Sequence, residues 1–211
     1  MTFNIEFALI ALFSYLLGSI PFSLLFGKLW GVDIRTKGSG NVGAVNTIRS
    51  AGMIPGALAL FFDVGKGALA IVLAKYWLNL ADNLMIVIGV CSVIGHAYPI
   101  FLKFRGGKCV ATSAGVMLIL SPIALCVSLV MYGIALFCSN KTPFIASTAG
   151  TIVFPIFTIL AYHYQPQWYS PLLELNYNYF LTATIFLFVL ILYKHTPNYK
   201  QWLKERKTDK Y

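Results

Sequence analysis

Long apolar runs separated by short polar loops leave few folds open to this chain. Such runs recur between residues 5 and 193, and most approach the ~20 residues that a helix needs to cross a bilayer core. Because lipid offers no hydrogen-bond partners, a spanning backbone must be helical or form a closed barrel. With 58% hydrophobic and only 11% charged residues, we expect an all-α polytopic integral membrane protein, with a single membrane domain over residues 1–211.

The basic residues predict the orientation of the chain. Lys and Arg gather in loops around 31–52 and 103–109 and in the tail 194–211, whereas 79–83 and 164–177 contain none. Cytoplasmic loops of membrane proteins carry the excess of Lys and Arg. We therefore expect the first three segments in the cytoplasm, the last two outside, the N-terminus outside and the C-terminus cytoplasmic. The charge of +9 is spread over loops, so we expect membrane lipids and no nucleic acid as partners.

This orientation predicts seven transmembrane helices. A single pass through 110–140 would leave the basic tail outside, so we divide it at Ser121-Pro122, where proline removes a backbone donor. The first pass, 110–120, then measures only about 16 Å and should be packed inside the bundle; six helices are the alternative. The expected spans are 5–30, 53–78, 84–102, 110–120, 122–139, 143–163 and 178–193.

Cysteine and histidine are sparse and scattered. The chain has four cysteines and three histidines, with no C-x-x-C pair. This spacing favours neither a disulfide framework nor a zinc site. We expect no metal and no other cofactor.

Three polar segments should meet on the cytoplasmic side: KGSGNVGAVNTIRS (37–50), GHAYPIFLKFRGGKCVAT (95–112) and KHTPNYK (194–200). Glycines allow close approach of backbone to a ligand, and a helix N-terminus after them favours an anion. The segments are rich in hydrogen-bond donors and poor in acids, which suits phosphate oxygens. The polar residues are Ser39, Asn41, Asn46, Arg49, His96, Lys108, Thr112, His195 and Asn198.

Two of these segments carry a family resemblance. Ser39–Arg49 (SGNVGAVNTIR) resembles the first signature of the bacterial acyl-phosphate:glycerol-3-phosphate acyltransferases, the PlsY family. Gly95–Pro99 with Phe104–Lys108 resembles the second, and Asp63 with Lys66-Gly67 matches an Asp-x-x-Lys-Gly in the second helix. The third signature is matched in part, by His195 and Asn198, whereas Gln201 stands where a basic residue is usual. Cys109 replaces the usual glycine, which is tolerable only if that position needs neither a positive φ nor a very close ligand.

The resemblance spans nearly the whole chain and implies a seven-helix enzyme of the bacterial cytoplasmic (inner) membrane, with its active site facing the cytoplasm. It would transfer an acyl chain from acyl phosphate to the 1-hydroxyl of sn-glycerol 3-phosphate. The products would be lysophosphatidic acid and phosphate, in phospholipid biosynthesis. An enzyme that forms acyl phosphate is the expected functional partner.

The chemistry assigns roles to the polar residues. Acyl phosphate is a mixed anhydride with a stable leaving group, so the enzyme must mainly place the hydroxyl, neutralise phosphate charge and polarise the carbonyl. The base is left open between His96, His195 and a substrate phosphate, and we favour the phosphate, with its second pKa near 6. The expected catalytic residues are Ser39, Arg49, Lys108, His195 and Asn198. The expected substrate-binding residues are Gly40, Asn41, Gly43, Asn46, His96, Gly106, Gly107 and Thr112.

Other interpretations remain. A small transporter for a phosphorylated or anionic solute would also have ionisable residues and broken helices inside the membrane. A lipid-binding scaffold would have basic patches but gives no reason for the ordered glycine elements. We expect Asp63 and Lys66, one helical turn apart, to form a buried structural pair.

Overall fold

The structure is a computed structural model that describes residues 5–78, 80–165, 168, 170 and 173–208, with side chains as far as Lys204. These residues form helices and no strand. The helices are α1 (Ile5–Ser19), α2 (Phe22–Leu29), α3 (Ala44–Ala51), α4 (Met53–Tyr76), α5 (Asp82–Ala97), the 3-10 turn η1 (Ile100–Leu102), α6 (Val110–Leu120), α7 (Pro122–Cys138), α8 (Pro143–Tyr164) and α10 (Tyr177–Thr208).

Five helical stretches among the described residues are long and apolar enough to cross a membrane: Ile5–Leu29, Met53–Tyr76, Asp82–Leu102, Pro143–Tyr164 and Tyr177–Lys204. α6 and α7 are shorter apolar helices. Many large apolar side chains point away from the bundle, among them Phe61, Val130 and Phe137. Such faces are suited to lipid, which agrees with the all-α membrane class predicted from the sequence.

Two predicted spans differ from the observed helices. Residues 5–30 do not form one helix, because the chain breaks at Ile20-Pro21 and continues as α2; proline cannot supply the backbone N–H that a continuous helix needs. The last helix does not end at residue 193 but continues to Thr208, through Pro197. The predicted division at Ser121-Pro122 is confirmed as the boundary between α6 and α7.

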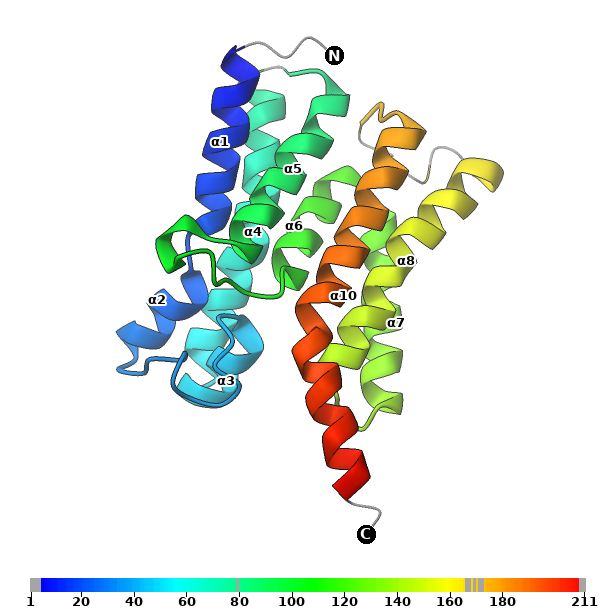
Figure 1. Cartoon of the computed structure of the whole chain (residues 1–211). Helices are drawn as coiled ribbons and strands as arrows, with labels where there is room; N and C mark the ends of the chain where they lie inside the picture. Colours follow the sequence, from blue (N-terminus) through cyan, green and yellow to red (C-terminus); the bar gives the residue numbers. More distant parts are fainter. Residues whose placement is uncertain (1–4, 79, 166–167, 169, 171–172, 209–211) are drawn as a thin grey trace.

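The helices form two groups that lie side by side (Figure 1). One group packs α1, α4, α5 and α6 together, with α2 and α3 against α4, and the other packs α8 between α7 and α10. The groups meet where α6 contacts α7 and α5 contacts α10. The main apolar core runs through both groups and includes Ile71, Met85, Met117, Phe180 and Leu187. α1 begins at one end of the bundle, and α10 ends at the other (Figure 1).

Candidate active site

The first polar segment is a loop folded around the side chain of Asn46. Its Nδ2 donates to the carbonyl oxygens of Ile34, Lys37 and Asn41 at 2.8, 3.2 and 3.1 Å. Its Oδ1 accepts the backbone N–H of Ser39 at 3.0 Å, and the side chain is 2% exposed. We expected Asn46 to bind substrate, but its amide is occupied by the loop, so it acts by setting the shape of that loop.

The same loop leaves Ser39 and Arg49 open to solvent. Gly40 has φ +67, a left-handed conformation that glycine adopts without strain, and the chain then enters α3 with Gly43 as its N-cap. Arg49 lies in the last turn of α3 and is exposed. A small apolar cluster of Leu24, Ile34 and Val42 fastens the loop to α2.

The Gly106-Gly107 turn is packed too tightly for any side chain. A Cβ on Gly107 would lie 2.3 Å from His96 Nε2 and 2.5 Å from the Val42 carbonyl oxygen, and one on Gly106 would lie 2.2 Å from the His96 carbonyl oxygen. The Gly107 N–H donates to that His96 oxygen at 3.2 Å. The glycines therefore join the end of α5 to the first polar segment, so this N–H is used inside the protein.

Lys108 connects the second polar segment to the third. Its Nζ donates to Asn198 Oδ1 at 2.6 Å. Burial lowers the pKa of Lys108, the positive charge of nearby Arg49 lowers it in the same direction, and together they bring it to about 8. Lys108 also acts electrostatically on His195, whose Nδ1 donates to the Ile191 carbonyl at 2.8 Å. The structure thus brings together Arg49, Lys108, His195 and Asn198, as expected from the sequence.

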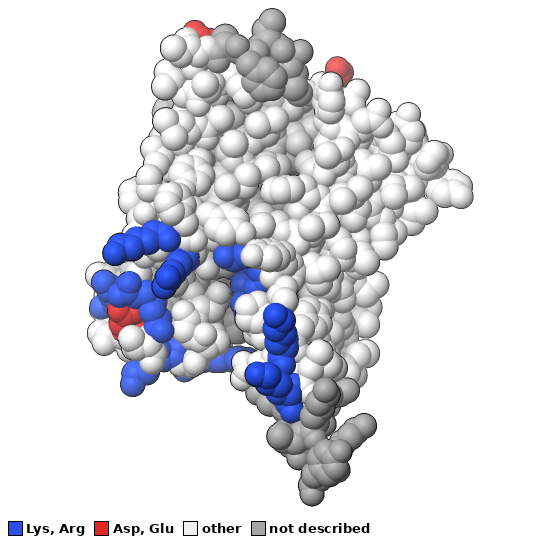
Figure 2. Space-filling model, viewed as in Figure 1, with Lys and Arg blue, Asp and Glu red and all other residues white. Residues whose placement is uncertain are grey.

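Figure 2 shows where the Lys and Arg side chains lie on one face of the molecule. On the face shown, Lys and Arg side chains gather at the end that carries α2, α3 and the C-terminal half of α10, on both sides of a hollow between them. The described basic residues of these elements include Lys28, Arg49, Lys200 and Lys204. A concave, cation-lined surface concentrates anionic ligands.

Two residues at the start of α6 differ from expectation. Thr112 is fully buried, and its carbonyl oxygen lies only 2.3 Å from where a Cβ on Gly67 of α4 would be. Thr112 therefore belongs to the contact between α4 and α6. This differs from our expectation that Thr112 binds substrate. Cys109 is also fully buried and has φ +63, so it occupies the left-handed conformation in which glycine is favoured. Burial raises the pKa of its thiol to about 12.

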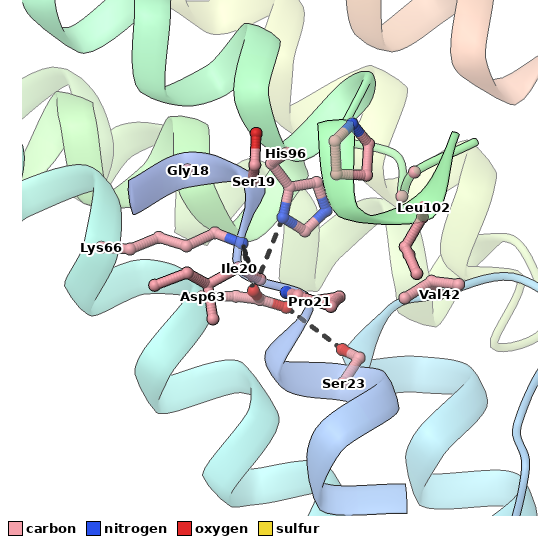
Figure 3. A pocket seen from close by; sticks show the side chains of 13 residues that line it. Gly18, Ser19, Ile20, Pro21, Ser23, Val42, Asp63, Lys66, His96 and Leu102 are labelled. Atoms are coloured by element: carbon pink, nitrogen blue, oxygen red, sulfur yellow. Dashed lines mark hydrogen bonds and ion pairs between the residues drawn. The ribbon is translucent and has the colours of Figure 1, made fainter. Parts of the chain in front are cut away.

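A small pocket lies behind the glycine turn, between the break in α1–α2 and the middle of α4 (Figure 3). Its lining includes the expected residues His96, Gly106 and Gly107 together with Asp63 and Lys66. Asp63 and Lys66 form the predicted buried ion pair, with Lys66 Nζ 2.8 Å from Asp63 Oδ1. In the described part of the chain, no group of His, Cys, Asp or Glu is arranged to hold a metal ion.

Sequence reasoning missed Lys194. It was counted only as a basic residue of the tail, but its Nζ donates to the Ala97 carbonyl at 2.9 Å and lies 4.6 Å from the centre of the Tyr98 ring. A cation at the last carbonyls of a helix is favourable. Lys194 therefore attaches α10 to the C-terminal end of α5, and only the three-dimensional contact reveals this role.

Comparison with known proteins agrees with this geometry. A family model for glycerol-3-phosphate acyltransferase matches residues 8–205. The glycerol-3-phosphate acyltransferase of Carboxydothermus hydrogenoformans is 40% identical over 194 residues, which cover 92% of this chain and 91% of the relative. The chain belongs to the glycerol-3-phosphate acyltransferase family. The Geobacillus kaustophilus member of the family is 37% identical over 199 residues, covering 94% and 93% of the two chains.

Two crystal structures resemble the fold of this acyltransferase. Both are of PlsY, an integral membrane glycerol 3-phosphate acyltransferase. Its glycerol 3-phosphate form superposes with a TM-score of 0.80 and 33% identity, covering 95% of this chain and 94% of that one. Its lysophosphatidic acid form gives a TM-score of 0.79 and 34% identity, covering 95% and 93%. The chain is thus a multi-pass membrane acyltransferase of the PlsY family, and the transporter alternative is not favoured.

Proposed function

We propose that this acyltransferase moves an acyl chain from acyl phosphate to the 1-hydroxyl of sn-glycerol 3-phosphate. One observation carries the proposal: Lys108 Nζ lies 2.6 Å from Asn198 Oδ1, with the charge of Arg49 close enough to lower the pKa of Lys108. Two like charges held together at a half-buried site repel each other. An anion between them relieves that repulsion, and both substrates carry phosphate.

The reaction needs positioning more than a protein nucleophile. The hydroxyl oxygen of glycerol 3-phosphate forms a bond to the acyl carbon, the bond from that carbon to the phosphate oxygen breaks, and phosphate leaves with the electron pair. The hydroxyl proton goes to a substrate phosphate, which has a second pKa near 6. The His195 Nδ1 is occupied by the Ile191 carbonyl, which leaves Nε2 as the ring nitrogen available to accept a hydrogen bond from substrate.

Each exposed or half-buried polar group then has a task. Arg49 grips a phosphate with its planar fork, and Lys108 supplies a point charge. Ser39, Asn41 and Asn198 hold hydroxyl or carbonyl oxygens, and Gly40 and Gly43 let the loop backbone come close. Asn46, His96, Gly106, Gly107 and Thr112 support this surface from inside the protein. The products are lysophosphatidic acid and phosphate, and an enzyme that forms acyl phosphate must supply the donor.

We further propose that the chain crosses the bacterial cytoplasmic membrane seven times, with α6 as a short internal pass. Two observations support this. α1 begins and α10 ends at opposite ends of the bundle, as an odd number of passes requires. The basic side chains gather at the end where α10 finishes, and Lys and Arg mark the cytoplasmic side.

The donor test uses purified protein, labelled glycerol 3-phosphate and one acyl chain presented either as acyl phosphate or as acyl-CoA. We expect lysophosphatidic acid from acyl phosphate and little from the thioester, which lacks a phosphate at the reacting carbon. Equal rates with the two donors would exclude this mechanism.

The residue test is Arg49→Lys, which keeps the charge and loses the fork. If Arg49 grips phosphate bidentately, kcat/KM for glycerol 3-phosphate should fall roughly 10- to 150-fold, or about 1.5–3 kcal/mol. The matched control is Arg35→Lys, because Arg35 is an exposed arginine that pairs with Asp33 at 2.6 Å. Wild-type kinetics in Arg49→Lys would show that Arg49 does not grip phosphate bidentately and serves only as a positive charge that sets topology.

A further inference from the structure

A buried charged cluster lies directly behind the proposed substrate surface (Figure 3). Asp63 Oδ1 lies 2.8 Å from Lys66 Nζ and 3.5 Å from His96 Nδ1. Its Oδ2 accepts the Ser23 hydroxyl at 3.1 Å. Asp63 is 1% exposed and Lys66 3%. Taking both ions out of water is unfavourable, and their mutual attraction must offset that desolvation, so we looked for a role of the cluster beyond its own neutralisation.

His96 connects this cluster to the glycine turn. One ring nitrogen, Nδ1, faces the Asp63 carboxylate, and the other, Nε2, lies against Gly107 where a Cβ would come within 2.3 Å. The His96 carbonyl also accepts the Gly107 N–H at 3.2 Å. Gly107 is therefore held by both the ring and the backbone of His96, and the Val42 carbonyl oxygen also lies close to it, 2.5 Å from where a Cβ would be. The next residue in the chain is Lys108.

Lys66 connects the same cluster to the first polar segment. Its Nζ donates to the Ile20 carbonyl at 2.9 Å, at the break between α1 and α2. Ser23, in the first turn of α2, has its carbonyl oxygen 3.4 Å from the Thr47 hydroxyl of α3, which is the helix that carries Arg49. The cluster thus contacts the supports of both proposed phosphate-binding cations.

We propose that Asp63 is a positioning residue for acyl transfer: through His96 it holds the Gly106-Gly107 turn, and so places Lys108 beside Asn198 and Arg49. The inference rests on the proposed function, because it assumes that Lys108 binds substrate phosphate. Asp63 does not touch substrate, since its carboxylate is enclosed by Lys66, His96 and Ser23. Its contribution is to fix where the Lys108 amine lies.

The test removes both charges together, in Asp63→Asn/Lys66→Met, so that no unpaired charge is left inside the protein. We expect this protein to remain folded, with kcat/KM for glycerol 3-phosphate reduced roughly 10- to 100-fold, mainly through a higher KM. The matched control is Lys75→Met/Asp82→Asn, which removes an ion pair between the C-terminal end of α4 and the start of α5. The control should keep wild-type kinetics at a similar thermal stability.

A double-mutant cycle with Lys108→Ala separates positioning from general destabilisation. If Asp63 acts through Lys108, the Asp63→Asn/Lys66→Met change should cost less than about twofold in a protein that already lacks the Lys108 amine. His96→Asn repeats the cycle without disturbing the ion pair, and covers the case in which the first variant does not fold. We expect the same non-additivity.

Two results would overturn the inference: wild-type kinetics in a folded Asp63→Asn/Lys66→Met protein, or losses that multiply fully with Lys108→Ala in both cycles. Failure of the proposed function gives a different pattern. In that case Lys108→Ala alone would leave the KM for glycerol 3-phosphate and kcat unchanged.

Discussion

At the scale of single residues, Lys108 depends most on its surroundings. Burial and the charge of Arg49 lower its pKa to about 8. If protonated Lys108 binds phosphate, kcat/KM for glycerol 3-phosphate should fall as pH rises through about 8, since kcat/KM reports ionisations of the free enzyme. The free energy of unfolding should instead increase as pH rises. Between about 8 and the ordinary value of 10.5, the unfolded chain binds the proton more tightly, so unfolding becomes less favourable as pH rises.

The check is a pH profile of kcat/KM from pH 7 to 9.5 for the wild type and Lys108→Arg. An arginine keeps its charge over this range, so the variant should lack the fall near pH 8, whatever its absolute activity. Superimposable profiles would show that another group controls the alkaline limb.

Cys109 provides a test of backbone strain. A residue with a Cβ in the left-handed region costs roughly 1–2 kcal/mol that glycine avoids. Cys109→Gly should therefore be more stable than Cys109→Ala by about 1 kcal/mol, although glycine normally destabilises relative to alanine. Thermal unfolding of the two variants in the same detergent decides the sign. A more stable alanine variant would contradict a strained left-handed backbone at Cys109.

Single-residue roles were only partly predictable from the sequence. The resemblance drew attention to Lys108, Asn198 and Arg49, and the structure brings them together. The same signature could not show that the Asn46 amide donates to three loop carbonyls, because backbone carbonyls are present at every residue and their positions depend on how the loop folds. The role of Lys194 is also invisible in one dimension, since its partners are 96 and 97 residues away.

At the scale of helices, α10 was predicted least well. The polar segment KHTPNYK predicted an end near residue 193. The helix continues because its far half packs on α8. Tyr199 and Trp202 make edge contacts with Phe144, with ring centroids 4.8 and 6.3 Å apart, and the Tyr199 hydroxyl donates to Thr148 Oγ1 at 3.0 Å. Tertiary packing here overrides local sequence signals.

This contact predicts a link between stability and substrate binding. Phe144→Ala should destabilise the protein by about 3 kcal/mol and raise the KM for glycerol 3-phosphate, because Asn198 precedes Tyr199 on the same turn. Tyr199→Phe keeps the ring contact and loses one hydrogen bond, so it should cost only about 1 kcal/mol and leave the KM unchanged. Thermal unfolding and steady-state kinetics test both. An unchanged KM in a destabilised Phe144→Ala protein would show that the packing of α10 on α8 does not affect substrate binding.

At the scale of the whole molecule, the apolar runs predicted the all-α membrane class, since their length and composition permit little else. The boundary at Ser121-Pro122 was predictable because charge placement and proline agreed there. The break at Ile20-Pro21 was not, because apolar residues continue on both sides of it and a hydropathy pattern does not register a missing backbone donor.

Topology can be tested by cysteine labelling in intact cells with a membrane-impermeant thiol reagent. The background replaces the four native cysteines, with glycine at 109 and alanine elsewhere. We expect Ala81→Cys and Glu174→Cys to react from outside, and Lys37→Cys, Lys103→Cys and Lys200→Cys to react only after the membrane is opened. Labelling of Lys200→Cys in intact cells would contradict seven passes and favour six.

The packing of the short helix α6 has a consequence for the order in which the helices assemble during synthesis. A translocation machinery meets residues 110–138 as one nearly continuous apolar stretch, and nothing in its hydropathy says where to divide it. α6 fits against α4 with backbones almost touching: a Cβ on Gly115 would fall 1.9 Å from the Val64 carbonyl oxygen. The surface that α6 packs against belongs to α4, which is synthesised earlier. The part of the chain already made therefore provides the binding surface for α6. We therefore expect the helices before residue 110 to assemble before α6 leaves the machinery, so that the docking of α6 on α4 sets the direction of the helices that follow.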